Sequence, residues 1–212
     1  MPSFPFSRLS FRRSALFTCV LSLALTLPQV AKSQQLVFWG QSMGGVLKPP
    51  SGLKGVVQIA AGQNHALALL ANGSVVGWGR DHHGESTPPP GLNGVVQIAA
   101  GWSESIALKS DGTVVSWPSY PAPAGLKDVV QVAVSVTHCL ALKSDGTVVA
   151  WGDNTLGAVS VPRGLSDVVH VSCDSDSSFA VRSNGSVVFW GNSWDGTMYP
   201  PDFSDVVRVT PG

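Results

Sequence analysis

The sequence predicts an all-β protein built of β-propeller blades, and three observations lead to this fold class. A Trp at the end of a short apolar run recurs with spacings of 39, 39, 34 and 39 residues, at Trp39, Trp78, Trp117, Trp151 and Trp190. An Asn-Gly or Asp-Gly pair stands a few residues before the last four of these Trp residues, and a Pro-containing connector separates one copy from the next. Self-similarity at this period indicates one supersecondary unit copied along the chain, because each copy is too small to bury its apolar face alone.

Each copy predicts three antiparallel strands, which in the first full repeat are residues 56–61, 65–70 and 74–78. Pairs such as Asn72-Gly73 tolerate the positive φ of a two-residue type I′ turn and therefore predict a hairpin between the second and third strands. The connectors, such as residues 89–92, lie outside the sheet because Pro cannot donate to a central ladder. A short fourth strand would complete a unit of roughly 40 residues, which is typical of a propeller blade. The absence of useful helical periodicity after residue 33 excludes helical solenoids.

The repeats divide the chain into a leader, residues 1–33, and a repeat region, residues 34–212. A lone third strand precedes the full repeats and a lone first strand follows them, so a closing blade shared between them would lack its middle strand. Three interpretations fit this count: a truncated gene product, an open arc, and an arc that completes itself by association through its open blade edges. The full repeats are 56–94, 95–128, 129–167 and 168–205, with partial repeats at 34–55 and 206–212.

The leader has the order of regions typical of a secretory signal peptide: basic residues, an apolar run and then small residues. Arg8, Arg12 and Arg13 precede an apolar run from residue 16 to 27, and residues 31–33 supply the small side chains that a signal peptidase reads. The run is too short for stable membrane insertion, because a spanning helix needs about 20 apolar residues. We therefore expect a mature chain that begins at Gln34 and is secreted, periplasmic or attached to the cell surface.

Removal of the leader leaves an acidic chain with two cysteines. The leader contains four of the 13 basic residues and none of the 13 acidic ones, so the repeat region has a net charge of −4. Without a basic cluster it has no positively charged surface to which the phosphates of a nucleic acid could bind. Cys139 and Cys173 fit either a disulfide between neighbouring repeats or two small buried thiols. The thiols are favoured because other repeats place Ala66 and Ala61 at these positions.

Comparison between the copies separates a repeated face from a variable one. In an up-and-down blade, the turn between the first two strands shares a face with the loop after the third strand, and both vary from copy to copy. Variable loops on a repeated scaffold are where such proteins place binding specificity. Trp102 and Trp194 lie on these loops, where each is either a binding hot spot or a ring packed over the rim of its own blade. The predicted binding residues are Gln63, Asn64, Trp102, Glu104, Asp153, Asn154, Trp194 and Asp195.

Catalytic residues, metal ligands and cofactor motifs are not predicted. His65 and His138 occupy the same repeat position, which favours a structural bond to the backbone of a neighbouring blade over catalysis. The loop with His82-His83 and the pair Asp174 and Asp176 each lack the further ligands that zinc or calcium needs. The chain also lacks a nucleophile elbow, a metalloprotease helix motif and a phosphate-binding loop.

The strings AAGQNHALALLANGSVVGWG (60–79) and ALKSDGTVVAWGDN (141–154) resemble repeats of the regulator-of-chromosome-condensation family. The resemblance covers residues 35–212, and the short period with a leader is more similar to the bacterial secreted branch, which includes the propeller-type β-lactamase inhibitor. It implies that aromatic residues just after the Ala-Gly pair grip the partner, and Trp102 is the one match here. In the eukaryotic branch it implies nucleotide exchange on a small GTPase, a partner that a secreted chain would not meet.

The sequence therefore predicts a non-enzymatic secreted repeat scaffold that binds a protein or a surface glycan through its variable face. Two alternatives stay open. One is an enzyme, a hydrolase or lyase, with carboxylates on the same face. The other is a fragment of a larger structural surface protein.

Overall fold

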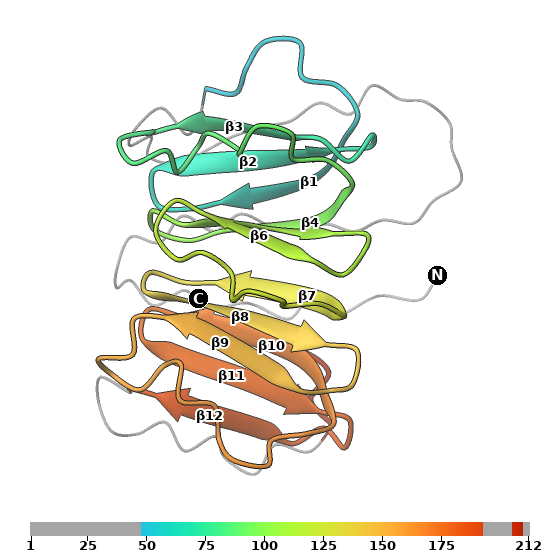
Figure 1. Ribbon diagram of the computed structural model, residues 1–212, viewed down its shortest axis with the longest axis vertical. Helices are drawn as coiled ribbons and strands as arrows, with labels where there is room; N and C mark the ends of the chain where they lie inside the picture. Colours follow the sequence, from blue (N-terminus) through green and yellow to red (C-terminus); the bar gives the residue numbers. More distant parts are fainter. Residues whose placement is uncertain (1–47, 193–204, 210–212) are drawn as a thin grey trace, which may run out of the picture.

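A computed structural model of the chain describes residues 48–192 and 205–209, and in these residues β-strands are the only regular elements. Figure 1 shows them in groups that follow one another in chain order. The strands are β1 (Val56–Ala61), β2 (His65–Leu70), β3 (Val75–Gly79), β4 (Val95–Ala100), β5 (Ser105–Lys109), β6 (Val114–Trp117), β7 (Val129–Val134), β8 (His138–Lys143), β9 (Val148–Gly152), β10 (Val168–Asp174), β11 (Ser177–Arg182) and β12 (Val187–Gly191).

The strands form four three-stranded antiparallel sheets, each made of consecutive strands, which we call blades 1 to 4. The all-β fold built of blades is thus confirmed, and β1 and β2 have the predicted bounds. The optional fourth strand does not form in the described residues. The connectors instead make turns in which the Leu92 N–H donates to the Pro89 carbonyl, and this arrangement repeats at Leu126 and Leu165. Pro removes the donors that a fourth ladder would need.

The hairpins differ from the predicted two-residue turn. In blade 1 the Gly73 N–H donates to the Leu70 carbonyl, and the Leu70 N–H donates to the Ser74 carbonyl, which encloses a three-residue loop. Gly73 has a φ of 79°, whereas Asn72 does not have positive φ. This is the pattern of a turn followed by a glycine bulge. The type I′ prediction was wrong because Asn72 uses its side chain, accepting from the N–H and hydroxyl of Ser74.

Apolar cores lie between neighbouring blades. Alternate residues of β8 face opposite ways: Cys139 packs with Ile106 of blade 2, and Leu140 packs with Val171 of blade 4. The four described repeat Trp residues are core residues as predicted, between 6% and 9% exposed. Cys173 lies on the Leu140 side of blade 3, so the two cysteines belong to different clusters, and both are buried free thiols.

A glutamine ladder joins the first strands of successive blades. Gln58 reaches from blade 1 to blade 2, where its Nε2 donates to the Ile98 carbonyl and its Oε1 accepts from the Ile98 N–H. Gln97 repeats this bond pair with Val132, and Gln131 repeats it with Val171. The ladder pairs backbone groups at the free edge of each first strand, which would otherwise lack partners. In blade 4, His170 takes this position and contacts the Val209 carbonyl at 3.1 Å.

Candidate functional site

The two sets of variable loops meet at one end of the blades. In blade 1 the Arg80 N–H donates to the Asn64 carbonyl at 2.7 Å, which joins the loop after the third strand to the first turn. The same bond runs from Asp153 to Thr137 in blade 3 and from Asn192 to Asp176 in blade 4. We call this end the loop surface. The hairpins lie at the opposite ends of the strands.

The first turns of successive blades lie in direct contact. A Cβ at Gly62 would be 2.1 Å from the Gly101 carbonyl oxygen, and a Cβ at Gly101 would be 2.0 Å from the Ser135 carbonyl oxygen. Glycine is therefore required wherever the backbone of the next turn approaches this closely. Blade 3 has Ser135 at this position, and its Oγ lies 3.1 Å from the Ser175 carbonyl oxygen. These contacts place the residues that follow in one row across the blades: Gln63, Trp102, Val136 and Ser175.

Among the described residues, three large apolar side chains are exposed on the loop surface. Trp102 is 46% exposed and Val136, the next residue in the row, is 38% exposed. Leu156, in the loop after β9, is 44% exposed. Sequence reasoning found Trp102 as the odd aromatic residue but missed the other two. Val136 could have been found from its repeat position, whereas nothing in the sequence singles out Leu156.

Glu104 is buried, which corrects the expectation that it lies on the exposed binding surface. Its side chain is 2% exposed, and its carboxylate accepts the N–H groups of Ser119 at 3.0 Å and Tyr120 at 3.1 Å. In the other blades a Gly such as Gly79 follows the repeated Trp, but here Pro118 does. The Ser119 N–H, which is equivalent to that of Arg80, bonds to Glu104 rather than to a carbonyl of the first turn. Burial raises the pKa of Glu104, against the lowering effect of the two N–H donors.

The other predicted binding residues fall into three groups. Gln63 is exposed, whereas Asn64 is 8% exposed and its amide donates to Gln63 Oε1. Asp153 and Asn154 are exposed and adjacent, so the structure brings them together on blade 3. Asn154 is tied to its own loop by bonds to Ser160 and Val159. Trp194 and Asp195 lie outside the described residues.

A small pocket opens on the loop surface between blades 3 and 4. Asp153 and Asp176 line it from neighbouring blades, and the lining is completed by Thr155, Leu156 and Ala158. Asp153 Oδ1 accepts both the N–H and the hydroxyl of Thr155, at 2.7 Å and 2.5 Å. These two bonds, the hydroxyl first, hold the pKa of Asp153 below its usual range. The pocket therefore presents ionised carboxylate beside apolar wall at neutral pH.

The two repeat-equivalent histidines bond the neighbouring blade through a serine. His65 Nε2 lies 2.8 Å from Ser105 Oγ, and His138 Nε2 lies 2.8 Å from Ser178 Oγ. The Ser105 hydroxyl donates to the Glu85 carbonyl. The structural role is as predicted, but the direct partner is a hydroxyl rather than backbone. Burial lowers the pKa of both histidines, for His138 to about 4.

The polar groups of the His82-His83 loop bond mainly to one another. The His83 N–H donates to Glu85, whose carboxylate also lies 3.6 Å from Arg80, and Asp81 accepts from Ser86 and Thr87. Among the described residues, no group of three or more His, Cys, Asp or Glu side chains could hold a metal ion. The part of the chain that the structure describes also contains no helix able to cross a membrane.

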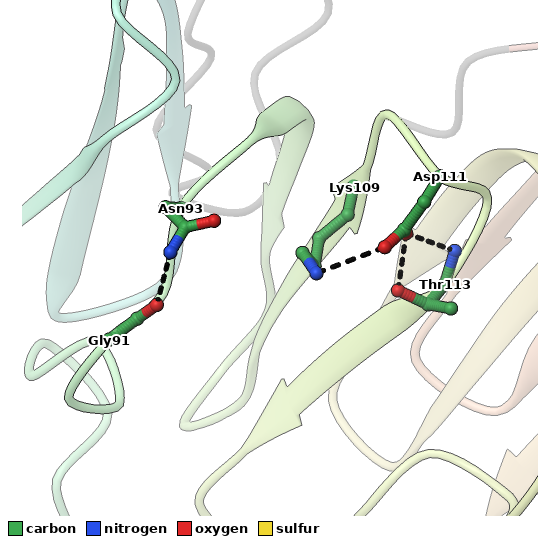
Figure 2. A network of polar contacts seen from close by, with 5 residues as sticks. All are labelled: Gly91, Asn93, Lys109, Asp111 and Thr113. Atoms are coloured by element: carbon green, nitrogen blue, oxygen red, sulfur yellow. Dashed lines mark hydrogen bonds and ion pairs between the residues drawn. The ribbon is translucent and has the colours of Figure 1, made fainter.

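The hairpin face carries a paired charge motif, shown in Figure 2. Asp111 Oδ1 accepts from the N–H and hydroxyl of Thr113, and its other oxygen lies 3.1 Å from Lys109 Nζ. These contacts, the Thr113 hydroxyl first, lower the pKa of Asp111 to about 2. Lys143 and Asp145 repeat the pair in blade 3. In all four described hairpins the side chain of an Asn or Asp accepts from the residue two positions on, at Asn72, Asp111, Asp145 and Asn184, so this contact recurs from blade to blade, in contrast to the loop surface.

The comparisons with known proteins agree with this architecture. The family profile "Regulator of chromosome condensation (RCC1) repeat" matches residues 56–85 and 129–158. No curated protein sequence gives a significant match.

Three solved structures illustrate the likeness of fold. Human WBSCR16 is 24% identical with a TM-score of 0.53, over 64% of this chain and 47% of that one. Prp20p from Saccharomyces cerevisiae, whose structure was described with its binding to Gsp1p and histones, is 22% identical with a TM-score of 0.57, over 68% and 47%. The ectodomain of the receptor kinase CR4 from Physcomitrella patens is 20% identical with a TM-score of 0.57, over 64% and 41%.

The chain thus spans about half the length of the solved structures it resembles. At these identities the likeness concerns the fold, and the repeat profile adds the type of repeat. The buried Trp at one register, the hairpin glycine and the three-stranded blade recur in all four described repeats. Residues 56–85 and 129–158 thus match the RCC1 repeat, and the described blades have the β-propeller type of fold.

Proposed function

We propose that this chain is a non-enzymatic, exported scaffold that binds another protein through its loop surface. The observation that carries the proposal is that Trp102 is 46% exposed. It lies on a turn that is in close backbone contact with the turns of both neighbouring blades, through Gly62 and Gly101. An aromatic side chain held on a rigid turn is a typical binding hot spot, because little conformational entropy is lost when a partner covers it.

Two further features support a protein partner. Trp102 and Val136 follow one another in the row of first turns, and together with Leu156 they make this end apolar as well as variable. Prp20p, which has the same fold, was described as binding Gsp1p and histones, so the architecture serves protein recognition in at least one relative. Export rests on the leader, residues 1–33, which lies outside the described residues.

The test is capture of a partner by the tagged protein from culture medium and cell-surface extracts. Trp102→Ala should weaken the captured interaction at least about tenfold, since a desolvated aromatic anchor often contributes more than about 2 kcal/mol to binding. Val130→Ser is the matched control, because Val130 is an apolar residue that is 54% exposed at the hairpin end of β7. Loss of binding in the Val130 variant with full binding in the Trp102 variant would contradict the surface assignment. A captured ligand that resists protease would contradict a protein partner.

A further inference from the structure

The Lys and Arg residues of the described chain are unevenly distributed between the two ends of the blades. Arg80 is the one Lys or Arg of the described loop surface, and it lies 3.6 Å from Glu85. Asp153 is exposed there, and Asp174 and Asp176 are half-buried. In contrast, Lys109 and Lys143 lie at the hairpin end, where each is paired with an aspartate. The loop surface is thus acidic and lacks a cation of its own near blades 3 and 4.

The pocket between blades 3 and 4 is lined by two carboxylates, Asp153 and Asp176, that can accept further hydrogen bonds. Asp153 uses Oδ1 for Thr155, and in the described residues its other oxygen contacts no cation. Within the described ranges, the Asp176 carboxylate receives one contact, at 3.3 Å from Thr137 Oγ1, whose shorter bond, at 2.9 Å, goes to the Ser175 carbonyl. Both carboxylates can therefore accept strong hydrogen bonds from a charged donor.

The walls of the pocket decide what kind of cation fits. Leu156 and Ala158 form part of the lining, and a Lys or Arg side chain can lay its methylene stem on such a wall while its charged head meets the carboxylates. Thr137, which contacts Asp176, directly follows Val136, so the pocket adjoins the apolar row that contains Trp102. A ligand that covers both must carry apolar groups next to its positive charge.

We infer that the loop surface binds a basic polypeptide segment, with a Lys or Arg head between Asp153 and Asp176 and an adjacent apolar side chain on Val136 and Trp102. This inference rests on the proposed function and adds the chemistry of the partner. Net charge supports it as well: the repeat region carries −4, so a basic partner is attracted at long range.

The experiment selects random linear 12-residue peptides displayed on phage against the full chain, and then measures the synthesised, fluorescently labelled peptides by anisotropy. The expected peptides contain Lys or Arg beside an apolar residue and bind more weakly as salt rises. Asp153→Asn and Asp176→Asn should each weaken them about two- to fivefold, the range of partly exposed ion pairs. Trp102→Ala should weaken them about tenfold or more.

Asp111→Asn is the matched charge control. Asp111 makes the same two bonds to a threonine two residues on as Asp153 does, and Asn can keep that acceptor, but Asp111 lies on the hairpin face and is paired with Lys109. It should leave peptide affinity unchanged, and thermal unfolding checks that every variant is folded.

The outcomes separate the inference from the proposed function. Neutral or acidic peptides that depend on Trp102 but not on Asp153 or Asp176 would overturn the inference and leave the proposed function standing. Peptides whose binding is insensitive to Trp102→Ala would count against both. Failure to enrich any peptide would overturn the inference alone, since the capture experiment with whole proteins does not depend on a linear segment.

Discussion

His138 Nε2 lies 2.8 Å from Ser178 Oγ, across the interface between blades 3 and 4. The single hydroxyl proton of Ser178 is donated to the Ala158 carbonyl at 2.8 Å, so the serine must accept from the imidazole. Nε2 of His138 therefore carries a proton. Because burial lowers the pKa of His138 to about 4, the ring is neutral at pH 7, and its Nδ1 accepts the Ser135 hydroxyl at 2.9 Å. The same arrangement joins His65 to Ser105 between blades 1 and 2.

This geometry predicts acid sensitivity. Burial lowers the pKa of His138 from 6.5 to about 4, although Asp176 opposes the shift. Because the folded pKa lies below the unfolded one, the full stability is present above pH 6.5 and is lost as the pH falls from 6.5 through 4, by up to about 3 kcal/mol. Thermal unfolding of the protein and of His138→Gln across this range measures the effect. The variant should show a shallower pH dependence, and identical slopes would contradict the prediction.

Trp151 and Trp102 should differ sharply in their effect on stability. Trp151 is 9% exposed, packs with Ile106 and Val132, and donates its indole N–H to the Tyr120 carbonyl of blade 2. Trp151→Ala should destabilise the fold by about 3–5 kcal/mol, and Trp102→Ala by about 1 kcal/mol or less. Denaturant unfolding distinguishes the two, and equal midpoints would refute the division between core and surface.

The glutamine ladder should contribute measurably to blade stacking. Gln97→Ala removes both bonds to Val132, which is 2% exposed, and leaves its N–H and carbonyl unpaired at a cost of about 1–3 kcal/mol. Gln97→Glu keeps the acceptor but turns an oxygen toward the Val132 carbonyl. This variant should be least stable at neutral pH and recover below about pH 4, where the carboxyl carries a proton that it can donate. A Gln97→Glu variant with no pH-dependent recovery would argue against the ladder.

The leader should be removed on export. Basic, apolar and small residues follow one another in residues 8–33, which predicts cleavage between Ser33 and Gln34. Intact-mass analysis of secreted protein should show a chain that begins close to Gln34. A cytosolic protein that keeps Met1 would rule out this proposal.

The sequence was sufficient for the architecture because the repeat itself encodes it. Val56–Ala61 and His65–Leu70 have the predicted bounds since apolar and β-branched runs between turn residues specify strands locally. The hairpin type was missed because Gly73 has positive φ in either kind of turn, and the choice depended on the side chain of Asn72.

The site was less predictable because it depends on contacts between blades. Glu104 stands at the buried repeat position of His65 and His138, but its bonds to Ser119 and Tyr120 depend on the segment after β6, where Pro118 replaces the usual Gly. Gln58 and Gln97 stand at one repeat position, where three of the four copies carry glutamine, but what the side chain bonds is visible only once the blades are stacked. The pocket combines Asp153 with Asp176 from different blades, a pairing that only stacking reveals.

The close approach at Gly62 and Gly101 has a consequence for engineering. Because backbone atoms of the next turn occupy the place of a Cβ, the spacing between successive turns does not depend on the side chains that follow. Randomising Gln63, Trp102 and Val136 together would therefore vary the chemistry of three neighbouring positions while the backbone keeps its spacing. The blades then form a scaffold for display libraries in which new specificities can be selected without redesigning the core.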